Sequence, residues 1–270
     1  MQREPLRVVA NELIGPYALV RLERGPLKAG TPGQFFMLEA PGRVLPRAFS
    51  LSLAPAGELG FLFEPVGPGS RAIAALTPGE AIHVAGPFGN GFDLTVERPL
   101  LVGGGIGVAP FPYLSERLAA PPALLGFRSA AHAEVAALIP NAEVVLDPTF
   151  VTDVLPDDPG DVLACGPEPM LDTVARLVPD AQLAREAPMA CGYGACYGCV
   201  VPVNGSYKRL CIEGPVVRGE THGSPTSPLL HGAPTQDRTS APAGLSPAPP
   251  ADASVADDEE IRRRRQDPLR

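Results

Sequence analysis

Four of the five cysteines in this 270-residue chain lie between positions 191 and 211. They are Cys191, Cys196, Cys199 and Cys211. The first three have the spacing C-x4-C-x2-C and the fourth follows downstream, an order typical of plant-type [2Fe–2S] ligands. Gly192, Gly194 and Gly198 fill the gaps, where they let the backbone adopt positive φ and bring its N–H groups close to cluster sulfides. The spacing therefore predicts a one-electron iron–sulfur centre held by four thiolates.

Two other uses of these cysteines stay open. A structural zinc site also takes four cysteines, but it usually pairs them in two C-x2-C knuckles, and here only Cys196 and Cys199 stand in that relation. A zinc-stabilised binding module is thus the non-enzyme alternative. Disulfides are disfavoured because the N-terminal residues form no apolar signal segment, so we expect the chain to stay in the reducing cytoplasm. Cys165 lies in a different motif and leaves the other four as a closed set.

The composition is that of a folded, acidic protein. Hydrophobic residues make up 45% of the chain, and its formal net charge is −8. An acidic surface argues against nucleic acid as a partner, because phosphate binding requires a concentrated basic face. Apolar runs such as 99–102 are far shorter than a bilayer span, so we expect no membrane segment.

The elements that must position the cysteines differ along the chain. Short β-type runs separated by Gly and Pro turns fill its first part, which predicts an antiparallel barrel. These runs are 7–14, 17–22, 34–38, 48–53, 60–66 and 81–85. From Pro99 onward, apolar runs alternate with helical stretches such as 108–120, which predicts a parallel sheet with helical crossovers.

The fold class expected from this pattern is β + α/β, in four parts. They are an antiparallel β-barrel over 1–98, a parallel-sheet α/β domain over 99–187, a [2Fe–2S] segment over 188–220 and a disordered tail over 221–270. The cysteine segment is too short to fold without its metal centre. The tail is rich in Pro, Ala and Ser and cannot bury a core.

The barrel contains a motif with an arginine, an aromatic residue and a serine. It is Arg47-Ala48-Phe49-Ser50, and it resembles the Arg-x-(Tyr/Pro)-Ser element that flavin-dependent reductases place on a barrel strand. A guanidinium there neutralises the FAD pyrophosphate, and the serine hydroxyl lies against the flavin ring. The plainer interpretation is a strand with an exposed arginine.

A second glycine-containing motif follows the next strand. Gly69 and Ser70 open a short predicted helix over 71–76. A helix N-terminus with a glycine and a hydroxyl suits the same pyrophosphate, although Ser70 would serve equally as an ordinary N-cap.

Two turns in the second domain have the composition of a dinucleotide site. The first contains Gly103, Gly105 and Gly107. It departs from G-x-G-x-x-G and resembles the Gly-Gly-x-Gly-x-(Ala/Thr)-Pro turn of ferredoxin reductase-like nucleotide domains. Cys165 and Gly166 begin a Cys-Gly-Pro-x-x-Met turn, which the same domains place beside the nicotinamide; otherwise Cys165 is a small buried apolar residue. Arg128 replaces the usual acid for the ribose, so the choice between NAD and NADP stays open.

In this order, the barrel, the nucleotide domain and the cysteine segment resemble the electron transfer subunits of NAD-linked dihydroorotate dehydrogenase. The resemblance covers roughly residues 5–218 and is most specific over 191–217. It implies FAD and one [2Fe–2S] cluster, with the four cysteines as cluster ligands. The FAD contacts that it implies are Arg47, Ala48, Phe49, Ser50, Glu64, Pro65, Val66, Gly69 and Ser70. Ala48 stands where many relatives have proline, and Ser70 where threonine is more usual.

The resemblance also implies a partner and an electron path. The partner is an FMN-containing catalytic subunit that oxidises dihydroorotate in pyrimidine biosynthesis, and two copies of each subunit form a heterotetramer. Electrons pass from FMN through the cluster and FAD to NAD, because FAD handles one- and two-electron steps. No side chain in this chain needs to act as acid or base, and Ser50 and Cys165 are expected nearest the flavin–nicotinamide contact. The alternative is the flavin subunit of another NAD(P)H-dependent ferredoxin or sulfide oxidoreductase.

Overall fold

The computed structural model describes residues 3–203 and 206–218. The predicted tail over 221–270 and the last positions of the predicted cysteine segment lie outside the described residues. Within the described ranges, no helix is both long enough and apolar enough to cross a bilayer.

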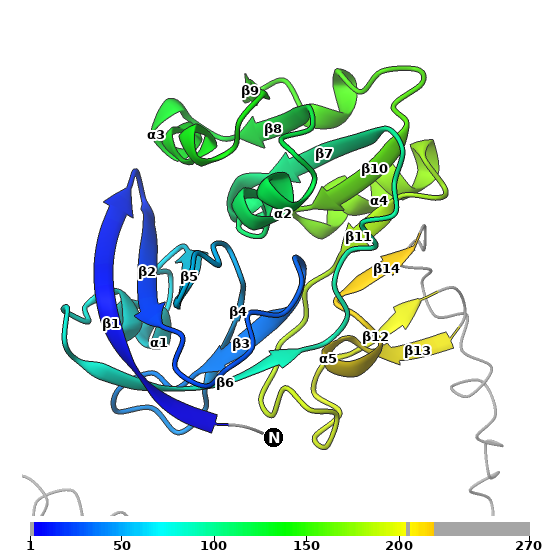
Figure 1. Ribbon diagram of the computed structural model, residues 1–270. Coiled ribbons are helices and arrows are strands. Elements are labelled where there is room, and N and C mark those ends of the chain that lie inside the picture. The colour runs from blue at the N-terminus through cyan, green and yellow to red at the C-terminus, as the bar shows by residue number, and fades with distance from the viewer. Residues whose placement is uncertain (1–2, 204–205, 219–270) are drawn as a thin grey trace, which may run out of the picture. The chain divides into compact units, whose positions relative to one another are not determined.

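The N-terminal part is a six-stranded sheet with the order β4-β3-β6-β1-β2-β5, in which every neighbouring pair is antiparallel (Figure 1). Its strands are β1 (Arg3–Ile14), β2 (Tyr17–Glu23), β3 (Phe35–Leu38), β4 (Arg47–Ser50), β5 (Glu58–Phe63) and β6 (Ala81–Phe88). The two end strands meet, because Leu53, just after β4, bridges to Gly60 of β5. The ring centroids of Phe49 and Phe63 lie 4.4 Å apart across the same gap. The sheet thus closes on itself as the predicted barrel requires.

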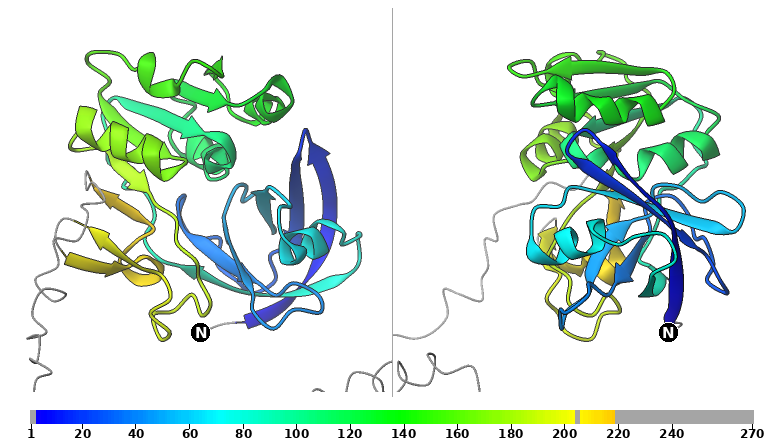
Figure 2. Two further views of the ribbon diagram at one scale, coloured as in Figure 1. Left: turned by 180° about the vertical axis from the view of Figure 1, so that it is seen from behind. Right: turned by 90° about the vertical axis from the view of Figure 1, so that its left-hand side faces the viewer.

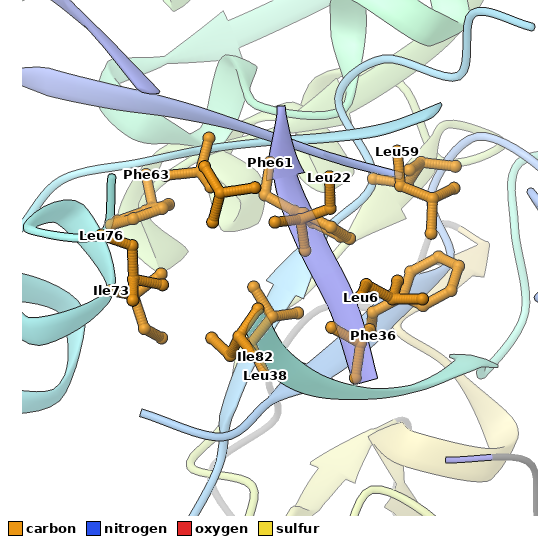
Figure 3. Packing of buried hydrophobic residues seen from close by; sticks show 14 of the residues in the cluster. Leu6, Leu22, Phe36, Leu38, Leu59, Phe61, Phe63, Ile73, Leu76 and Ile82 are labelled. Atoms are coloured by element: carbon orange, nitrogen blue, oxygen red, sulfur yellow. The ribbon is translucent and has the colours of Figure 1, made fainter. Parts of the chain in front are cut away.

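Alternating side chains from these strands fill the barrel interior (Figure 3). They include Leu6, Leu22, Phe36, Leu38, Leu59, Phe61, Phe63 and Ile82, joined by Ile73 and Leu76. Ile73 lies on α1 (Pro68–Ala74), which begins three residues before the predicted helix because proline fits the first turn, where no N–H bond is needed. Gly69 and Ser70 therefore lie inside the first turn of α1.

The second part is a six-stranded sheet with the order β14-β11-β10-β7-β8-β9. Its strands are β7 (Pro99–Gly104), β8 (Ala123–Phe127), β9 (Ala142–Leu146), β10 (Asp161–Cys165), β11 (Gln182–Ala184) and β14 (Val216–Arg218). The first five are parallel, and β14 is antiparallel to β11. Parallel strands require crossovers, and these run through the helices that flank the sheet (Figure 2).

Two apolar clusters cover the two faces of this sheet. α2 (Phe111–Arg117) packs into one of them and α4 (Glu168–Leu177) into the other, while the short α3 (Ala130–Ala133) follows β8. The predicted helix over 108–120 is shorter than expected. A 3-10 turn over Gly105–Val108 precedes α2, and the chain leaves the helix at Ala119, whose φ is 57°.

The cysteine segment contains β12 (Val200–Val203), β13 (Ser206–Arg209) and α5 (Leu210–Glu213) before it ends in β14. The first two strands form an antiparallel pair. Their side chains share a core with the outer face of the barrel, where Phe35 and Met37 of β3 lie beside Cys199 and Cys211. Because β14 belongs to the nucleotide sheet, the segment is packed against both larger parts.

Candidate functional site

The four cysteines form two pairs, and the pair Cys199 and Cys211 belongs to this shared core. The Sγ atoms of Cys199 and Cys211 lie 3.1 Å apart, and the backbone N–H of Cys211 donates to Cys199 Sγ at 3.5 Å. Cys191 and Cys196 form the second pair, because the Cys196 thiol donates to the Cys191 sulfur. Cys199 and Cys211 are buried, whereas Cys196 is exposed.

Backbone donors surround the first of these sulfurs. Burial raises the pKa of Cys191, but the N–H groups of Tyr193, Cys196 and Ala195 and the Cys196 thiol together lower that pKa to about 6. The pKa of Cys211 moves the other way, to about 12, through burial and then through its hydrogen bond with Cys199. Backbone N–H groups aimed at sulfur are the donors that also stabilise a metal–sulfur centre.

This donor set fits an iron–sulfur centre. Soft thiolate ligands select zinc or iron–sulfur clusters. Only Cys196 and Cys199 stand two residues apart, so the set lacks the two C-x2-C knuckles typical of a structural zinc site. The two thiol pairs, Cys191 with Cys196 and Cys199 with Cys211, suit a group with two metal ions.

Two glycines allow the cysteine loop to approach its neighbours. Gly192 has a φ of +79°, and a methyl group there would lie 2.7 Å from Cγ of Met37. Gly194 has a φ of +84°, and a methyl group there would lie 2.8 Å from Cγ1 of Ile212. Met37 is paired across the sheet with Ala48 of the predicted flavin motif. Met37 therefore lies between the cysteine loop and the flavin motif, next to Gly192 of the first and Ala48 of the second.

The structure also brings the two predicted flavin motifs together. Arg47 donates from Nη1 to the carbonyl oxygens of Leu45, at 2.8 Å, and Pro46, at 3.1 Å. Its guanidinium then lies against the Cα of Gly69, where a methyl group would come within 2.5 Å of Nε. The guanidinium thus occupies the space that a side chain at position 69 would need. A cation at the start of α1 suits an anionic cofactor.

The other predicted flavin contacts lie around this pair. Phe49 packs on Phe63, and Ala48 and Ser50 are half-buried on β4. The Ser70 hydroxyl accepts from the N–H of Gly67 at 3.0 Å and donates to its carbonyl at 3.1 Å. The N-cap is therefore Gly67 and not Ser70, which caps the helix from its third position. Arg71 donates to the carbonyl oxygens of Pro65 and Val66, at 3.2 and 3.0 Å. The side chain of Val66 is 68% exposed, an apolar surface beside the motif.

The predicted dinucleotide turns face a cavity of about 720 Å³. Gly105, Gly107 and Gly166 line it. Gly107 has no room for a side chain, because a methyl group there would lie 2.4 Å from Cα of Gly166. Gly103 lies behind the wall, against Phe111. Cys165 is 4% exposed and does not line the cavity, and burial raises the pKa of its thiol well above the usual range.

The polar wall of the cavity contains residues that the sequence did not single out. They are Tyr17, His132 and Glu186. Burial and the charge of Glu64 raise the pKa of Tyr17 to about 12, against the effect of Arg128. Burial, with the charge of Glu168, also raises the pKa of Glu186. No local pattern marks these residues, because each reaches the cavity from a different element.

Comparisons with known proteins agree with this arrangement. A family model described as the iron–sulfur cluster binding domain of dihydroorotate dehydrogenase B matches residues 186–221. The dihydroorotate dehydrogenase B (NAD(+)) electron transfer subunit of Clostridium perfringens is 32% identical over 226 residues, which are 76% of this chain and 91% of that protein. The subunit of the same name from Bacillus caldolyticus is 35% identical over 248 residues, 80% of this chain and 96% of that protein.

Solved structures show the same fold. One, from work on an NADH-dependent reduced ferredoxin-NADP oxidoreductase, aligns with a TM-score of 0.71 at 22% identity, over 80% of this chain and 88% of that one. Phthalate dioxygenase reductase aligns with a TM-score of 0.56 at 16% identity, over 75% of this chain and 87% of that one. The predicted ferredoxin reductase-like architecture is confirmed.

Proposed function

This chain belongs to the family of dihydroorotate dehydrogenase B electron transfer subunits, and we propose that it passes electrons from a catalytic subunit to NAD through a [2Fe–2S] cluster and FAD. The observation that supports this most directly is the position of Met37. It contacts the cysteine loop at Gly192 and pairs with Ala48 of the flavin motif. One-electron and two-electron carriers held on either side of this residue lie near each other.

The four cysteines hold the cluster as two pairs. Cys191 and Cys196 supply one pair of thiolates, and Cys199 and Cys211 supply the other, which matches two iron ions with two thiolates each. When bound, such a cluster accepts and releases one electron at a time. The N–H donors around Cys191 stabilise negative charge on sulfur, and the apolar core around Cys199 excludes water.

The residues of β4 and α1 hold FAD. Arg47, fixed against Gly69, would neutralise the pyrophosphate. Ser50 and the segment from Glu64 to Val66 would supply further contacts to FAD, and the exposed Val66 side chain would become covered. When bound, FAD exchanges single electrons with the cluster and a hydride with the nicotinamide.

The cavity at the nucleotide domain takes NAD. Gly105 and Gly107 allow the backbone to approach a pyrophosphate, and Gly166 lies at the carboxyl end of β10, where open α/β sheets bind their ligands. The chain positions the two reacting rings and contributes no acid or base to the transfer. Cys165 is a neutral, buried thiol behind this site.

Exposed apolar side chains around the cysteine loop form the surface for the catalytic subunit. They are Tyr193, Tyr197, Tyr207 and Ile212. Arg209 lies over the ring of Tyr197 at 5.2 Å. Aromatic residues with an arginine are typical of protein–protein interfaces. The catalytic subunit docks here, beside the exposed Cys196, and two copies of each subunit assemble in the cytoplasm.

The test is reconstitution with the catalytic subunit. The chain is co-purified from its native cells, and dihydroorotate-dependent reduction of NAD⁺ is measured before and after removal of the partner. We expect turnover only with both subunits, flavin absorbance, and a rhombic [2Fe–2S] resonance after reduction. A colourless protein that contains zinc would refute the electron-transfer function. Recovery of a different partner, such as a sulfide-oxidising enzyme, would refute the assignment to dihydroorotate.

A further inference from the structure

The side chain of Arg209 lies beside the cysteine loop, residues 191–199. Arg209 is the last residue of β13, where it pairs with Val200 of β12 in the small two-stranded sheet (Figure 1). Val200 directly follows Cys199, and the N–H of Leu210 donates to the carbonyl oxygen of Cys199 at 3.1 Å. The two strands therefore fix the backbone of Arg209 at the point where the loop ends.

The guanidinium contacts the loop through a peptide group. Nη1 of Arg209 donates to the carbonyl oxygen of Gly194 at 3.3 Å. The N–H of the same peptide unit is that of Ala195, and it donates to the sulfur of Cys191. Because the C=O and N–H of a trans peptide point in opposite directions, the guanidinium, the peptide and the sulfur form one chain of hydrogen bonds. Each bond in such a chain polarises the next and strengthens it.

A second contact holds the guanidinium against the loop. Cζ of Arg209 lies 5.2 Å from the ring centroid of Tyr197, within the range of a cation–π interaction. Tyr197 lies between Cys196 and Cys199 and has a φ of 60°, which is uncommon for a residue other than glycine. Such a backbone conformation persists where the surrounding structure holds it, and the guanidinium over the ring is one such contact.

One acid opposes the charge of this arginine. Oε2 of Glu213 accepts from the backbone N–H of Arg209 at 2.9 Å and lies 3.6 Å from Nε of its side chain. The two side chains are 33% and 44% exposed, for arginine and glutamate, so solvent weakens the ion pair. A cation and an acid thus lie at the same end of the cysteine loop and act on it with opposite sign.

We propose that Arg209 is a positioning residue that raises the reduction potential of the [2Fe–2S] cluster, and that Glu213 lowers it. This inference rests on the proposed function. Reduction adds one electron to the cluster and breaks no bond; the catalytic subunit supplies that electron, and FAD accepts it afterwards. Net charge and hydrogen bonds to sulfur set the potential of such clusters. A cation beside the loop, with a polarised N–H donating to Cys191, therefore favours the form with the extra negative charge.

The experiment is a redox titration of the [2Fe–2S] resonance in the full chain, loaded with FAD and cluster, at low salt and without the catalytic subunit. In Arg209→Gln we expect the ratio of reduced to oxidised cluster at a fixed potential to fall at least about threefold. This is a downward shift of about 28 mV, since a tenfold change corresponds to about 59 mV for one electron. Arg209→Lys keeps the charge but loses the planar donor group, so its potential should lie between those two values. Glu213→Gln should raise the potential.

Arg98→Gln is the matched control. Arg98 also pairs with an acid, Asp158 at 2.7 Å, but it lies in the nucleotide domain, and its loss should leave the potential unchanged. Where Arg209→Gln retains less iron, Glu213→Gln decides the case, because it leaves the side chain of Arg209 in place. An unchanged potential in iron-loaded Arg209→Gln, or an unchanged or lowered potential in Glu213→Gln, would overturn the inference. An unaltered chain that holds no iron would instead refute the proposed cluster itself.

Discussion

Replacing Gly192 by alanine tests whether the cysteine loop must touch the barrel. Gly192 has a φ of +79°, and the added methyl group would lie 2.7 Å from Cγ and 3.0 Å from Sδ of Met37. Two separate costs are therefore expected. Left-handed backbone costs an L-residue about 1–2 kcal/mol, and overpacking of a filled core costs about 1–3 kcal/mol more.

The second cost can be isolated with a matched glycine. Gly57 has nearly the same φ, +82°, but nothing lies within 4 Å of a methyl group added there. Gly57→Ala should thus lose only the backbone part, about 1–2 kcal/mol. Gly192→Ala should lose about 1–3 kcal/mol more than Gly57→Ala in the free energy of unfolding.

A double-mutant cycle with Met37→Ala supplies the independent check. Truncating Met37 leaves a cavity, so the methyl group added by Gly192→Ala then has room. The loss in the free energy of unfolding of the double variant should therefore be smaller than the sum of the two single losses by about 1–3 kcal/mol. Stability is compared from urea midpoints of the protein loaded with FAD and cluster, with iron content as a second readout. Equal losses in Gly192→Ala and Gly57→Ala, together with additive effects of Met37→Ala, would refute this contact.

Three further outcomes are expected. Cys199→Ser should lose its iron but keep FAD, because Arg47 and Gly69 lie on other elements. Iron and flavin contents are assayed on one sample. Full iron content in this variant would contradict the proposed set of cluster ligands. Arg47→Ala should weaken FAD binding by about 1.5–3 kcal/mol in dialysis, the range for a hydrogen bond to a charged group, whereas Arg43→Ala in the exposed loop should not. Burial and the charge of Glu168 raise the pKa of Glu186 above 4.5, so the folded state holds a proton that the unfolded state releases. The free energy of unfolding should therefore fall as pH rises from about 4.5 through the raised pKa. This decrease should be absent from the Glu186→Gln variant. If the urea midpoints of the unaltered protein and of Glu186→Gln change in parallel across that pH range, the prediction is wrong.

The barrel was predictable because its signals are local. The strand predicted over 17–22 is Tyr17–Glu23, and the run over 81–85 is the first part of Ala81–Phe88. Each is bounded by glycine or proline turns, and apolar residues repeat along it, so pattern and boundary agree. The cysteine spacing is equally local, and the cluster-binding domain of the family matches the same residues.

Contacts between distant segments had no such signal. Nothing near Glu64 indicates that it meets Arg128, and nothing near Val216 indicates that β14 completes the nucleotide sheet. Both depend on how the two sheets pack, a property of the whole chain. The helix predicted over 108–120 was too long for a related reason. Its composition is helical, but Pro110 and Pro112 lack the N–H that a continuous helix would use, and Ala119 leaves it with positive φ.

The strand β3 connects the fold to the proposed electron path. Its four residues are all buried, although the outer face of an antiparallel sheet commonly meets solvent. Phe36 and Leu38 fill the barrel core, whereas Phe35 and Met37 point into the core shared with the cysteines. An uninterrupted buried run thus indicates that something covers the outer face of a strand, and β2 and β5 have such runs as well. Covering these two side chains contributes about 1.5–3 kcal/mol each, so the energy that seats the cysteine segment also sets its distance from the flavin motif on β4.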